Sequence, residues 1–437
     1  MGDDLLALSS RIIDEGITDV AVNRVTNELS ELGDGLAIVE SFSHCVALAT
    51  DDGLVCFDAS GAHTGRDVVA ALRTWSGDRV RSLVYTHGHL DHVGGSGAFA
   101  LDADDAGRPR PEVVGHEALP ARLDRYELTS GYNLVINARQ FGAVRRELKL
   151  GIGGGTTGAP RFVPGDVLRP DVTVGDRHDL DVGGVRIELH HARGETDDHL
   201  WSWLPARRTI VAGDFLIWNF PNAGNPQKVQ RYPVEWAAAL RDMAALDVEL
   251  LVPAHGLPIA GTSRIRQVLD DVATALEELV ADTLAMMNDG EPLDHILHSV
   301  RVRPELLERP YLRPFYDEPE FVVRNVWRQF GGWYDGNPAR LKPAPDATVA
   351  VELARLSGGA GALAERGREL AAAGDLRLAC HLVELAAAAA PDDYAVHAAR
   401  ADVYEARRDA ETSLMAKGIF GAAARASHHA TEPTKES

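Results

Sequence analysis

The sequence predicts an α/β layered domain followed by an all-α domain. Short apolar strands alternate with helices between residues 36 and 126, and a second strand-rich block follows at 172–220. Beyond about residue 264 the chain is rich in Ala, Leu and Glu with helical spacing. A chain of 437 residues is also long enough for two or three domains. We expect a helical lead at 1–29, an α/β domain at 30–263, a helical domain at 264–425 and a disordered tail at 426–437.

The elements of the first domain follow in order. "GLAIVES", "HCVALAT" and "GLVCFDAS" (within 35–60) are short apolar runs separated by turn residues, which is typical of strands. Residues 64–77 have helical spacing and end at a glycine, so they are predicted to form a helix. A strand is expected at 80–85, and a strand, a turn and a helix at 112–126.

The second half begins with a similar alternation and then becomes helical. An amphipathic helix is predicted at 234–247 and a strand at 248–256, and residues 263–290 form one long helical pattern. Residues 360–412 have the small-residue helix–turn–helix texture of a tetratricopeptide-like repeat. We therefore expect the helical domain to be repeat-like.

Composition and charge exclude several classes of function. The formal net charge is −21, which disfavours binding to nucleic acid or to an anionic membrane surface. No apolar run approaches the ~20 residues needed to span a membrane. The three cysteines are far apart in the sequence (Cys45, Cys56 and Cys380). This spacing gives no support for a disulfide framework, so we expect unreactive free thiols in a reducing compartment. We expect a cytoplasmic protein without nucleic-acid or membrane partners.

The stretch "THGHLDH" (86–92) carries three histidines and a carboxylate directly after an apolar strand. Imidazole nitrogens and carboxylate oxygens are ligands for divalent metals. Alternate residues of an extended segment point the same way, so His87 and His89 can bind one ion. The segment then bends, and Asp91 and His92 can bind a second ion.

This HxHxDH pattern resembles the signature of the metallo-β-lactamase-fold superfamily, over roughly residues 30–262. The resemblance implies an αββα sandwich and three further ligands at strand ends. Asp214 in "TIVAGDF" matches the acid that bridges the two ions, and His255 in "LLVPAHG" matches the last histidine. The remaining ligand is usually a histidine, and here Glu195 stands in its place. If Glu195 is only a solvated loop residue, His190 or His191 would be the ligand instead.

The carboxylate at position 195, together with later motifs, resembles the alkyl sulfatases of that superfamily. "FGGWYDGNPARLKP" (330–343) resembles a phrase in their helical dimerisation domain, and "KLGIGGGTTG" (149–158) resembles their glycine-rich segment. The resemblance implies two Zn²⁺ per chain and a homodimer through the helical domain. We expect a short form of this family, with a catalytic and a dimerisation domain and without its sterol-carrier-like module.

The segment after Asp214 departs from the family pattern. Alkyl sulfatases place a Thr-His pair, a His-Asn pair and a sulfate-holding Arg-Gly there, whereas this chain reads "DFLIWNFPNAGNPQKVQRYP". Asn222 matches the asparagine, but the Thr-His and Arg-Gly pairs are missing. The candidate substrate-binding residues therefore include two replacement cations and three residues farther upstream (Asn222, Lys228, Arg231, Tyr132, Asn137 and Arg139).

The resemblance implies a metal-dependent hydrolase in which a metal-bridging hydroxide attacks an alkyl sulfate ester or a closely related small-molecule ester. Asp91 and Asp214 are the expected catalytic carboxylates. The missing Arg-Gly keeps a second hypothesis open, a hydrolase of the same fold and metals that acts on a thioester, a lactone or a phosphate-type ester. A third hypothesis is a non-catalytic scaffold.

Overall fold

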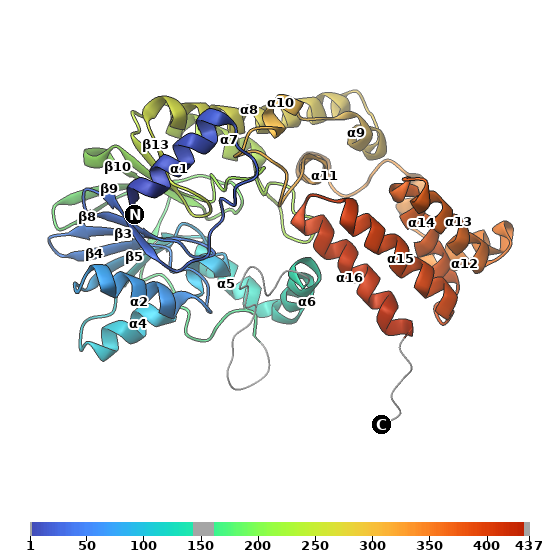
Figure 1. Cartoon of the computed structure of the whole chain (residues 1–437), viewed down its shortest axis with the longest axis horizontal. Helices are drawn as coiled ribbons and strands as arrows, with labels where there is room; N and C mark the ends of the chain where they lie inside the picture. Colours follow the sequence, from blue (N-terminus) through green and yellow to red (C-terminus); the bar gives the residue numbers. More distant parts are fainter. Residues whose placement is uncertain (1, 143–160, 432–437) are drawn as a thin grey trace. The chain divides into compact units, whose positions relative to one another are not determined.

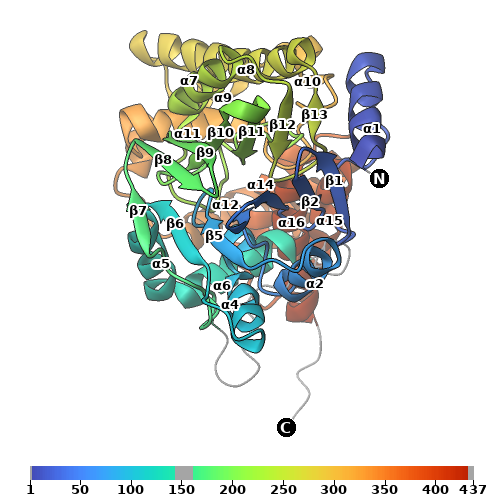
Figure 2. The same cartoon turned by 90° about the vertical axis from the view of Figure 1, so that its left-hand side faces the viewer.

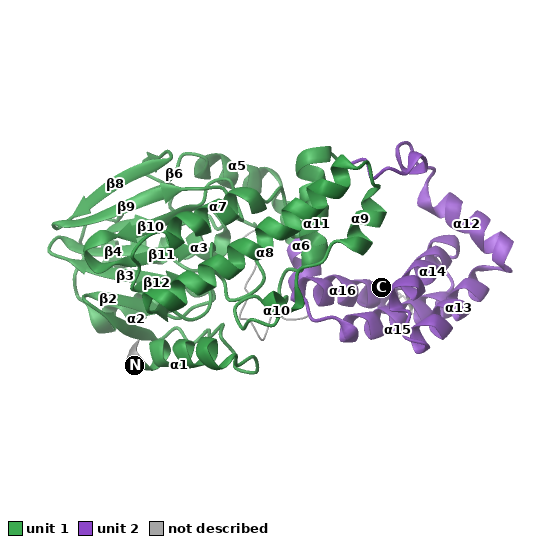
Figure 3. Ribbon diagram, turned by 90° about the horizontal axis from the view of Figure 1, so that it is seen from above, with its two compact units in different colours: residues 1–135, 145–332 green, residues 136–144, 333–437 purple. Residues whose placement is uncertain are grey.

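The computed structural model describes residues 2–142 and 161–431. The chain divides into two compact units, shown in green and purple in Figure 3. The first comprises residues 1–135 and 145–332, and the second residues 136–144 and 333–437. The predicted boundaries of the four sequence regions remain predictions, and the glycine-rich segment 149–158 lies outside the described residues.

A seven-stranded sheet forms one half of the first unit, in the order β1-β2-β3-β4-β5-β6-β7 across the described residues. The pairs from β1 to β4 are antiparallel, and those from β4 to β7 are parallel. The strands are β1 (Leu29–Gly33), β2 (Leu36–Val39), β3 (Cys45–Thr50), β4 (Gly53–Phe57), β5 (Val80–Val84), β6 (Glu112–His116) and β7 (Val172–Val174).

A six-stranded sheet forms the other half, in the order β13-β12-β11-β10-β9-β8. Its pairs are antiparallel apart from β11 and β12, which run parallel. The strands are β8 (Arg177–Val182), β9 (Val185–His191), β10 (Leu200–Leu204), β11 (Thr209–Gly213), β12 (Leu250–Pro253) and β13 (Ile259–Ala260).

The two sheets face each other between layers of helices (Figures 1 and 2). Buried side chains of both sheets, such as Ile38 and Ile210, share one core with Trp236 and Leu269 from the helices that cover the second sheet. A separate core joins the outer face of the first sheet to its own helices. The covering helices are α7 (Pro233–Ala244) and α8 (Thr262–Asn288) on the second sheet, and α2 (Gly65–Trp75), α4 (Ser96–Asp105) and α5 (Leu119–Leu128) on the first. The predicted αββα sandwich is confirmed.

The remaining helices of the first unit and the start of the second have the following bounds: α1 (Gly2–Glu15), α3 (Leu90–Val93), α6 (Ser130–Phe141), η1 (Pro205–Arg207), α9 (Leu293–Ser299), α10 (Pro304–Leu307), α11 (Pro319–Gly331) and η2 (Pro338–Arg340). α6 spans the division between the two units.

The second unit packs small residues between antiparallel helices. Ala386 and Ala399 are buried in its core, and Gly367 lets α13 approach α14 so closely that a Cβ there would lie 2.6 Å from Val383 Cγ1. Its main helices are α12 (Asp346–Ser357), α13 (Ala360–Ala372), α14 (Leu376–Ala389), α15 (Tyr394–Ala410) and α16 (Leu414–Thr431). The predicted all-α second part is confirmed. Among the described helices, none is both long and apolar enough to cross a membrane.

Candidate metal centre

The histidine-rich motif follows β5 at the carboxyl edge of the first sheet. His87 and His89 lie in the extended segment after β5, and the single turn of α3 then turns Asp91 and His92 in another direction. The glycine pair that follows is required by packing, because a Cβ on Gly95 would lie 2.1 Å from the carbonyl oxygen of Ala59. The motif is thus held tightly against the end of β4.

The structure brings six of the predicted ligands into two groups of three. The potential ligand atoms of His87, His89 and Asp214 all lie within 4.8 Å of one another, and so do those of the second group (Asp91, His92 and His255). Asp214 belongs to the first group and also faces the second. Its Oδ2 is 3.7 Å from His87 Nε2, and its Oδ1 is 3.4 Å from His92 Nε2 and 3.5 Å from His255 Nε2.

Two parallel strands deliver Asp214 and His255 to this place. Asp214 directly follows β11, and His255 lies two residues after β12. Because β11 and β12 run parallel, their carboxyl ends meet at the same edge of the second sheet. Residues 41 positions apart in the sequence therefore face the same space as the motif from the first sheet.

Glu195 lies in the loop between β9 and β10 and is 4% exposed. Its Oε1 is 3.5 Å from His89 Nδ1. The same oxygen is 3.1 Å from Arg231 Nη1 and accepts a hydrogen bond from the side-chain amide of Asn222. Glu195 thus stands beside the first group, and two of the predicted substrate-binding residues contact it.

Burial and neighbouring charges set the protonation of the cluster. Burial, together with nearby cationic groups, lowers the pKa of His87 and of His89 well below the usual value, so both imidazoles are neutral and offer lone pairs. Burial also opposes the charged form of His92, but the carboxylates of Asp214 and Asp58 raise its pKa well above the usual value. His87 and His89 are therefore neutral donors for a cation, whereas His92 is held protonated by its carboxylate neighbours and would release that proton when an ion binds.

The unpaired atoms of the cluster fit divalent ions. Among the described residues, His92 Nε2 and Asp214 Oδ1 are buried without a hydrogen-bond partner. His87 Nε2 and His89 Nδ1 face each other at 2.9 Å. Buried polar atoms are normally paired, so His92 Nε2 and Asp214 Oδ1 are expected to have a partner other than a side chain. Nitrogen and oxygen donors in this mixture suit Zn²⁺.

A shell of residues that the motif does not reveal orients the predicted ligands. Asp58 Oδ2 lies 2.7 Å from His92 Nδ1 and accepts a 2.7 Å hydrogen bond from Thr86 Oγ1. His255 Nδ1 donates to the carbonyl oxygen of Phe42 at 2.5 Å. These contacts fix which ring nitrogen of each histidine faces the cluster. One signal for Asp58 was present in the sequence, since it ends the strand next to the motif.

A buried ion pair holds the backbone of the motif. Asp198 is 0% exposed, and its Oδ2 accepts a 2.9 Å hydrogen bond from the backbone N–H of Gly88, which lies between His87 and His89. Its Oδ1 accepts a 2.9 Å hydrogen bond from Arg122 Nε of α5. Arg122 and Asp198 were not among the sequence-predicted residues, because only the fold brings them to Gly88.

The other predicted substrate-binding residues are Lys228, whose pKa is lowered by burial and affected by the charges of Arg231, Asp91 and Glu195, and three residues of α6. Lys228 is half-buried, and its Nζ lies 6.0 Å from the centre of the Phe162 ring. Tyr132, Asn137 and Arg139 lie on α6, where Asn137 is buried and the other two are exposed. Asn137 and Arg139 belong to the second compact unit. Substrate contact by these residues remains a prediction.

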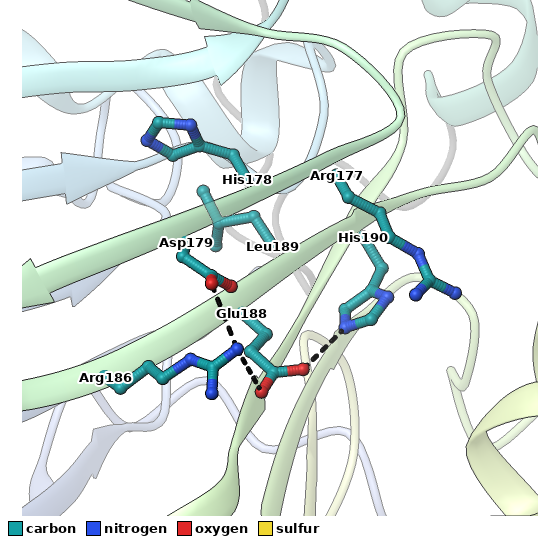
Figure 4. A pocket seen from close by; sticks show the side chains of 7 residues that line it. All are labelled: Arg177, His178, Asp179, Arg186, Glu188, Leu189 and His190. Atoms are coloured by element: carbon teal, nitrogen blue, oxygen red, sulfur yellow. Dashed lines mark hydrogen bonds and ion pairs between the residues drawn. The ribbon is translucent and has the colours of Figure 1, made fainter.

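Neither of the alternative histidine ligands belongs to the two three-residue groups found among the described residues. His191 Nε2 lies 3.0 Å from the carbonyl oxygen of Asp197. His190 lines a pocket of about 420 Å³ on the β8–β9 hairpin, where its Nε2 lies 3.5 Å from Glu188 Oε2 (Figure 4). Arg186 spans Asp179 and Glu188 in the same pocket.

Comparison with known proteins agrees with this arrangement of fold and site. Residues 38–255 match the sequence model of the metallo-beta-lactamase superfamily, and residues 293–430 match the model described as alkyl sulfatase dimerisation. The fold and its metal-ligand cluster thus define a metallo-β-lactamase-fold protein. With both matches, the chain belongs to the alkyl sulfatase branch of that superfamily.

Two bacterial alkylsulfatases are similar to most of this chain. A linear primary-alkylsulfatase of Pseudomonas sp. (strain ATCC 19151) is 28% identical over 344 residues, which are 75% of this chain and 62% of the relative. An (R)-specific secondary-alkylsulfatase of Pseudomonas sp. is 27% identical over 81% of this chain and 55% of the relative. This chain therefore spans less than two thirds of the length of either relative.

A solved structure has the same fold. The stereoselective inverting sec-alkylsulfatase Pisa1 from Pseudomonas sp. superposes with a TM-score of 0.80 at 23% sequence identity. The superposition covers 93% of this chain and 66% of the Pisa1 chain.

Proposed function

We propose that this protein is a dizinc hydrolase that cleaves an alkyl sulfate ester. The observation that carries the proposal is the position of Asp214, whose Oδ2 faces His87 of the first group and whose Oδ1 faces His92 and His255 of the second. The alkylsulfatase relatives and the dimerisation domain support a sulfate ester as the substrate. The proposal comprises the identity of the metal, the number of ions and the substrate.

In this proposal, His87, His89 and Glu195 would hold one ion, Asp91, His92 and His255 would hold the other, and Asp214 would contribute to both. Two divalent ions, when bound there, supply a water of lowered pKa and positive charge that stabilises the negative charge developing on the ester. The shell around them limits the motion of each donor atom.

The carboxylates of the chain take the proton-handling role. Asp91 is the more exposed of the two catalytic candidates, with a side chain 31% exposed against 6% for Asp214. We assign to Asp91 the transient acceptance of the proton from the attacking water, through a carboxylate oxygen that does not hold the ion. Without ions, the charges of His92 and His255 overcome burial and lower the pKa of Asp214. With ions bound, both imidazoles would be neutral and the ions would keep Asp214 ionised.

One observation favours part of the second candidate, a hydrolase of the same fold acting on an uncharged ester such as a thioester or a lactone; a phosphate-type ester would need cations as a sulfate does. The guanidinium of Arg231, one of two cations available to replace the family's Arg-Gly, is paired with Glu195. That pairing leaves less positive charge for a sulfate group. Lys228 is the other cation of this loop.

A substrate panel distinguishes the candidates. The zinc-loaded protein is incubated with a medium-chain alkyl sulfate and, separately, with an acyl thioester, a lactone and a phosphate ester. Release of inorganic sulfate supports the first candidate. If the protein binds two zinc ions per chain but turns over only one of the other esters, the second candidate would replace the first. Fewer than about one zinc per chain after gentle purification would favour a non-catalytic scaffold.

We further propose that the protein is a homodimer formed through its helical domain, since residues 293–430 match the alkyl sulfatase dimerisation model. A cytoplasmic location remains a prediction from the sequence, and fractionation of the producing cells would test it.

A further inference from the structure

The loop that departs from the family pattern is clamped by residues at the start of α11. Residues 219–231 run between β11 and α7, and they carry Asn222 and Arg231 toward Glu195. The backbone N–H groups of Gly224 and Asn225 donate to Asp317 Oδ2 at 2.6 and 3.1 Å. The loop and α11 both belong to the first compact unit.

The far end of this loop is held by two amide side chains, those of Gln230 and Asn325. Gln230 Nε2 donates to the carbonyl oxygen of Arg231 at 2.8 Å. Asn325 Nδ2 donates to the same carbonyl oxygen at 2.9 Å, and Asn325 Oδ1 accepts from the N–H of Arg231 at 3.3 Å. Gln230 Nε2 also donates to Asn325 Oδ1 at 3.0 Å. Asn325 is 5% exposed. Only an amide offers both a donor and an acceptor in this arrangement, so aspartate or alanine cannot replace both bonds.

This backbone anchor determines where the Arg231 side chain points. Arg231 is 2% exposed; its Nη1 lies 3.1 Å from Glu195 Oε1 and donates to the carbonyl oxygen of Glu195. A buried carboxylate such as Glu195 is costly unless it is paired. Since Glu195 Oε1 is also 3.5 Å from His89 Nδ1, the guanidinium fixes the place of this ligand candidate beside His89.

We propose that Asn325 is a positioning residue: by fixing the backbone of Arg231 it holds the Arg231–Glu195 pair in place and so builds the metal site of His87, His89 and Glu195. This inference rests on the proposed two-metal function. It adds to that function a residue that touches neither ion nor substrate and that lies within the part of the chain matching the dimerisation model.

The first test measures zinc binding of the full-length protein by competition with a chromogenic chelator and by elemental analysis. Asn325→Ala should weaken one of the two zinc sites by about 10- to 100-fold, the usual effect of losing a residue that supports a metal ligand, and leave the other unchanged. The matched control is Arg324→Ala, because Arg324 is an exposed residue of the same helix. The control should bind both ions as the wild type does.

A double-mutant cycle separates positioning from general support of the fold. If Asn325 acts through Arg231, Asn325→Ala should change zinc affinity less than about twofold in an Arg231→Met background. If Asn325→Ala does not fold, Asn325→Asp takes its place in both tests, because it keeps the acceptor and loses only the donor.

Each outcome is decisive. A wild-type protein that takes up fewer than two zinc ions would overturn the proposed function, and the inference with it. Two ions in the wild type and unchanged binding in the Asn325 variant would overturn the inference alone. A loss of the same size in the Arg231→Met background would also overturn it, because Asn325 would then act by another route.

Discussion

Arg122 neutralises a buried carboxylate that holds the metal loop. Its side chain is 2% exposed, and its partner Asp198, which is 0% exposed, accepts the Gly88 N–H. Removing one partner of a buried pair leaves an uncompensated charge and typically costs about 3–5 kcal/mol. Arg122→Met should lower the free energy of unfolding in urea by that amount.

The control for this prediction is an exposed pair of the same chemistry. Arg110 and Asp104 lie 2.6 Å apart with side chains 58% and 44% exposed, so Arg110→Met should cost at most about 1 kcal/mol. Equal losses in the two variants would contradict the buried-charge argument.

Asp317 gives the loop clamp a dependence on pH. Burial raises the pKa of Asp317 from 3.8 to about 7, although three backbone N–H groups donate to the carboxylate. Since the pKa is higher in the folded state than in the unfolded state, the folded protein binds more protons between these values. Its stability should therefore fall as the pH rises from about 4 to about 7, by up to about 4 kcal/mol.

Asp317→Asn removes the charge and keeps one oxygen, which can accept the hydrogen bonds from Gly224 and Asn225 but not the third, from the N–H of Glu318. The free energy of unfolding of this variant minus that of the wild type should be larger at pH 8 than at pH 5, so the variant should gain relative stability as the pH rises. Urea titrations of both proteins at the two pH values measure this difference. A difference that does not change with pH would contradict the prediction.

At the residue scale, the local pattern of the sequence reaches the ligand candidates but not their supports. Four candidates lie within six positions, and the others follow or lie near apolar runs, so a local pattern is enough to find them. Ser43 Oγ, 3.0 Å from His92 Nδ1, is separated from it by 49 positions, and Asp198 is 110 positions from Gly88. Such pairs arise only from tertiary packing, which local spacing does not encode.

At the scale of elements, the approach of the 219–231 loop to α11 depends on a missing side chain. A Cβ on Gly224 would lie 2.4 Å from the backbone atoms of Phe321 and Val322, which cannot move aside as a flexible side chain could. Gly224→Ala should therefore lower stability by about 1–3 kcal/mol, as overpacking usually does.

Thermal denaturation measures this effect against Gly361→Ala in α13, where a Cβ would meet nothing within 4 Å among the described atoms. The control should lose no stability and can gain up to about 1 kcal/mol from the entropy of alanine. Equal changes in stability for the two variants would contradict the prediction that a Cβ at Gly224 is destabilising.

Elements with a strong apolar pattern were the predictable ones. The strands expected within 35–60 correspond to β2, β3 and β4, whose residues are almost all buried. β1 was not predicted, because "LSELG" is half-exposed and has no clear alternation. The pairing of β4 with β5 and of β11 with β12, which builds the site, is a matter of topology rather than of local pattern.

At the scale of the whole molecule, α12 offers a surface for the proposed homodimer. Val349, Leu353 and Leu356 are 42%, 39% and 76% exposed, and their spacing puts them on one face of the helix. Burying this face against a second copy would stabilise the dimer, so Leu356→Glu should weaken it strongly.

Light scattering at micromolar concentration measures the association. The control is Leu128→Glu, since Leu128 is 85% exposed at the end of α5 and lies outside the dimerisation match. A wild-type monomer would contradict the dimer, and a dimer unaffected by Leu356→Glu would place the interface elsewhere.

The clamp of Asn325 and Asp317 has a consequence for how such chains recombine. The superfamily match ends at residue 255 and the dimerisation match begins at residue 293, yet the first compact unit continues to residue 332. A gene fusion that exchanged the dimerisation part at the edge of its match would also exchange the partners of Gly224 and Arg231. A cut at residue 332 would keep the loop together with Asp317 and Asn325. Residue 332, rather than either edge of the matches, is therefore the better junction for chimaeras.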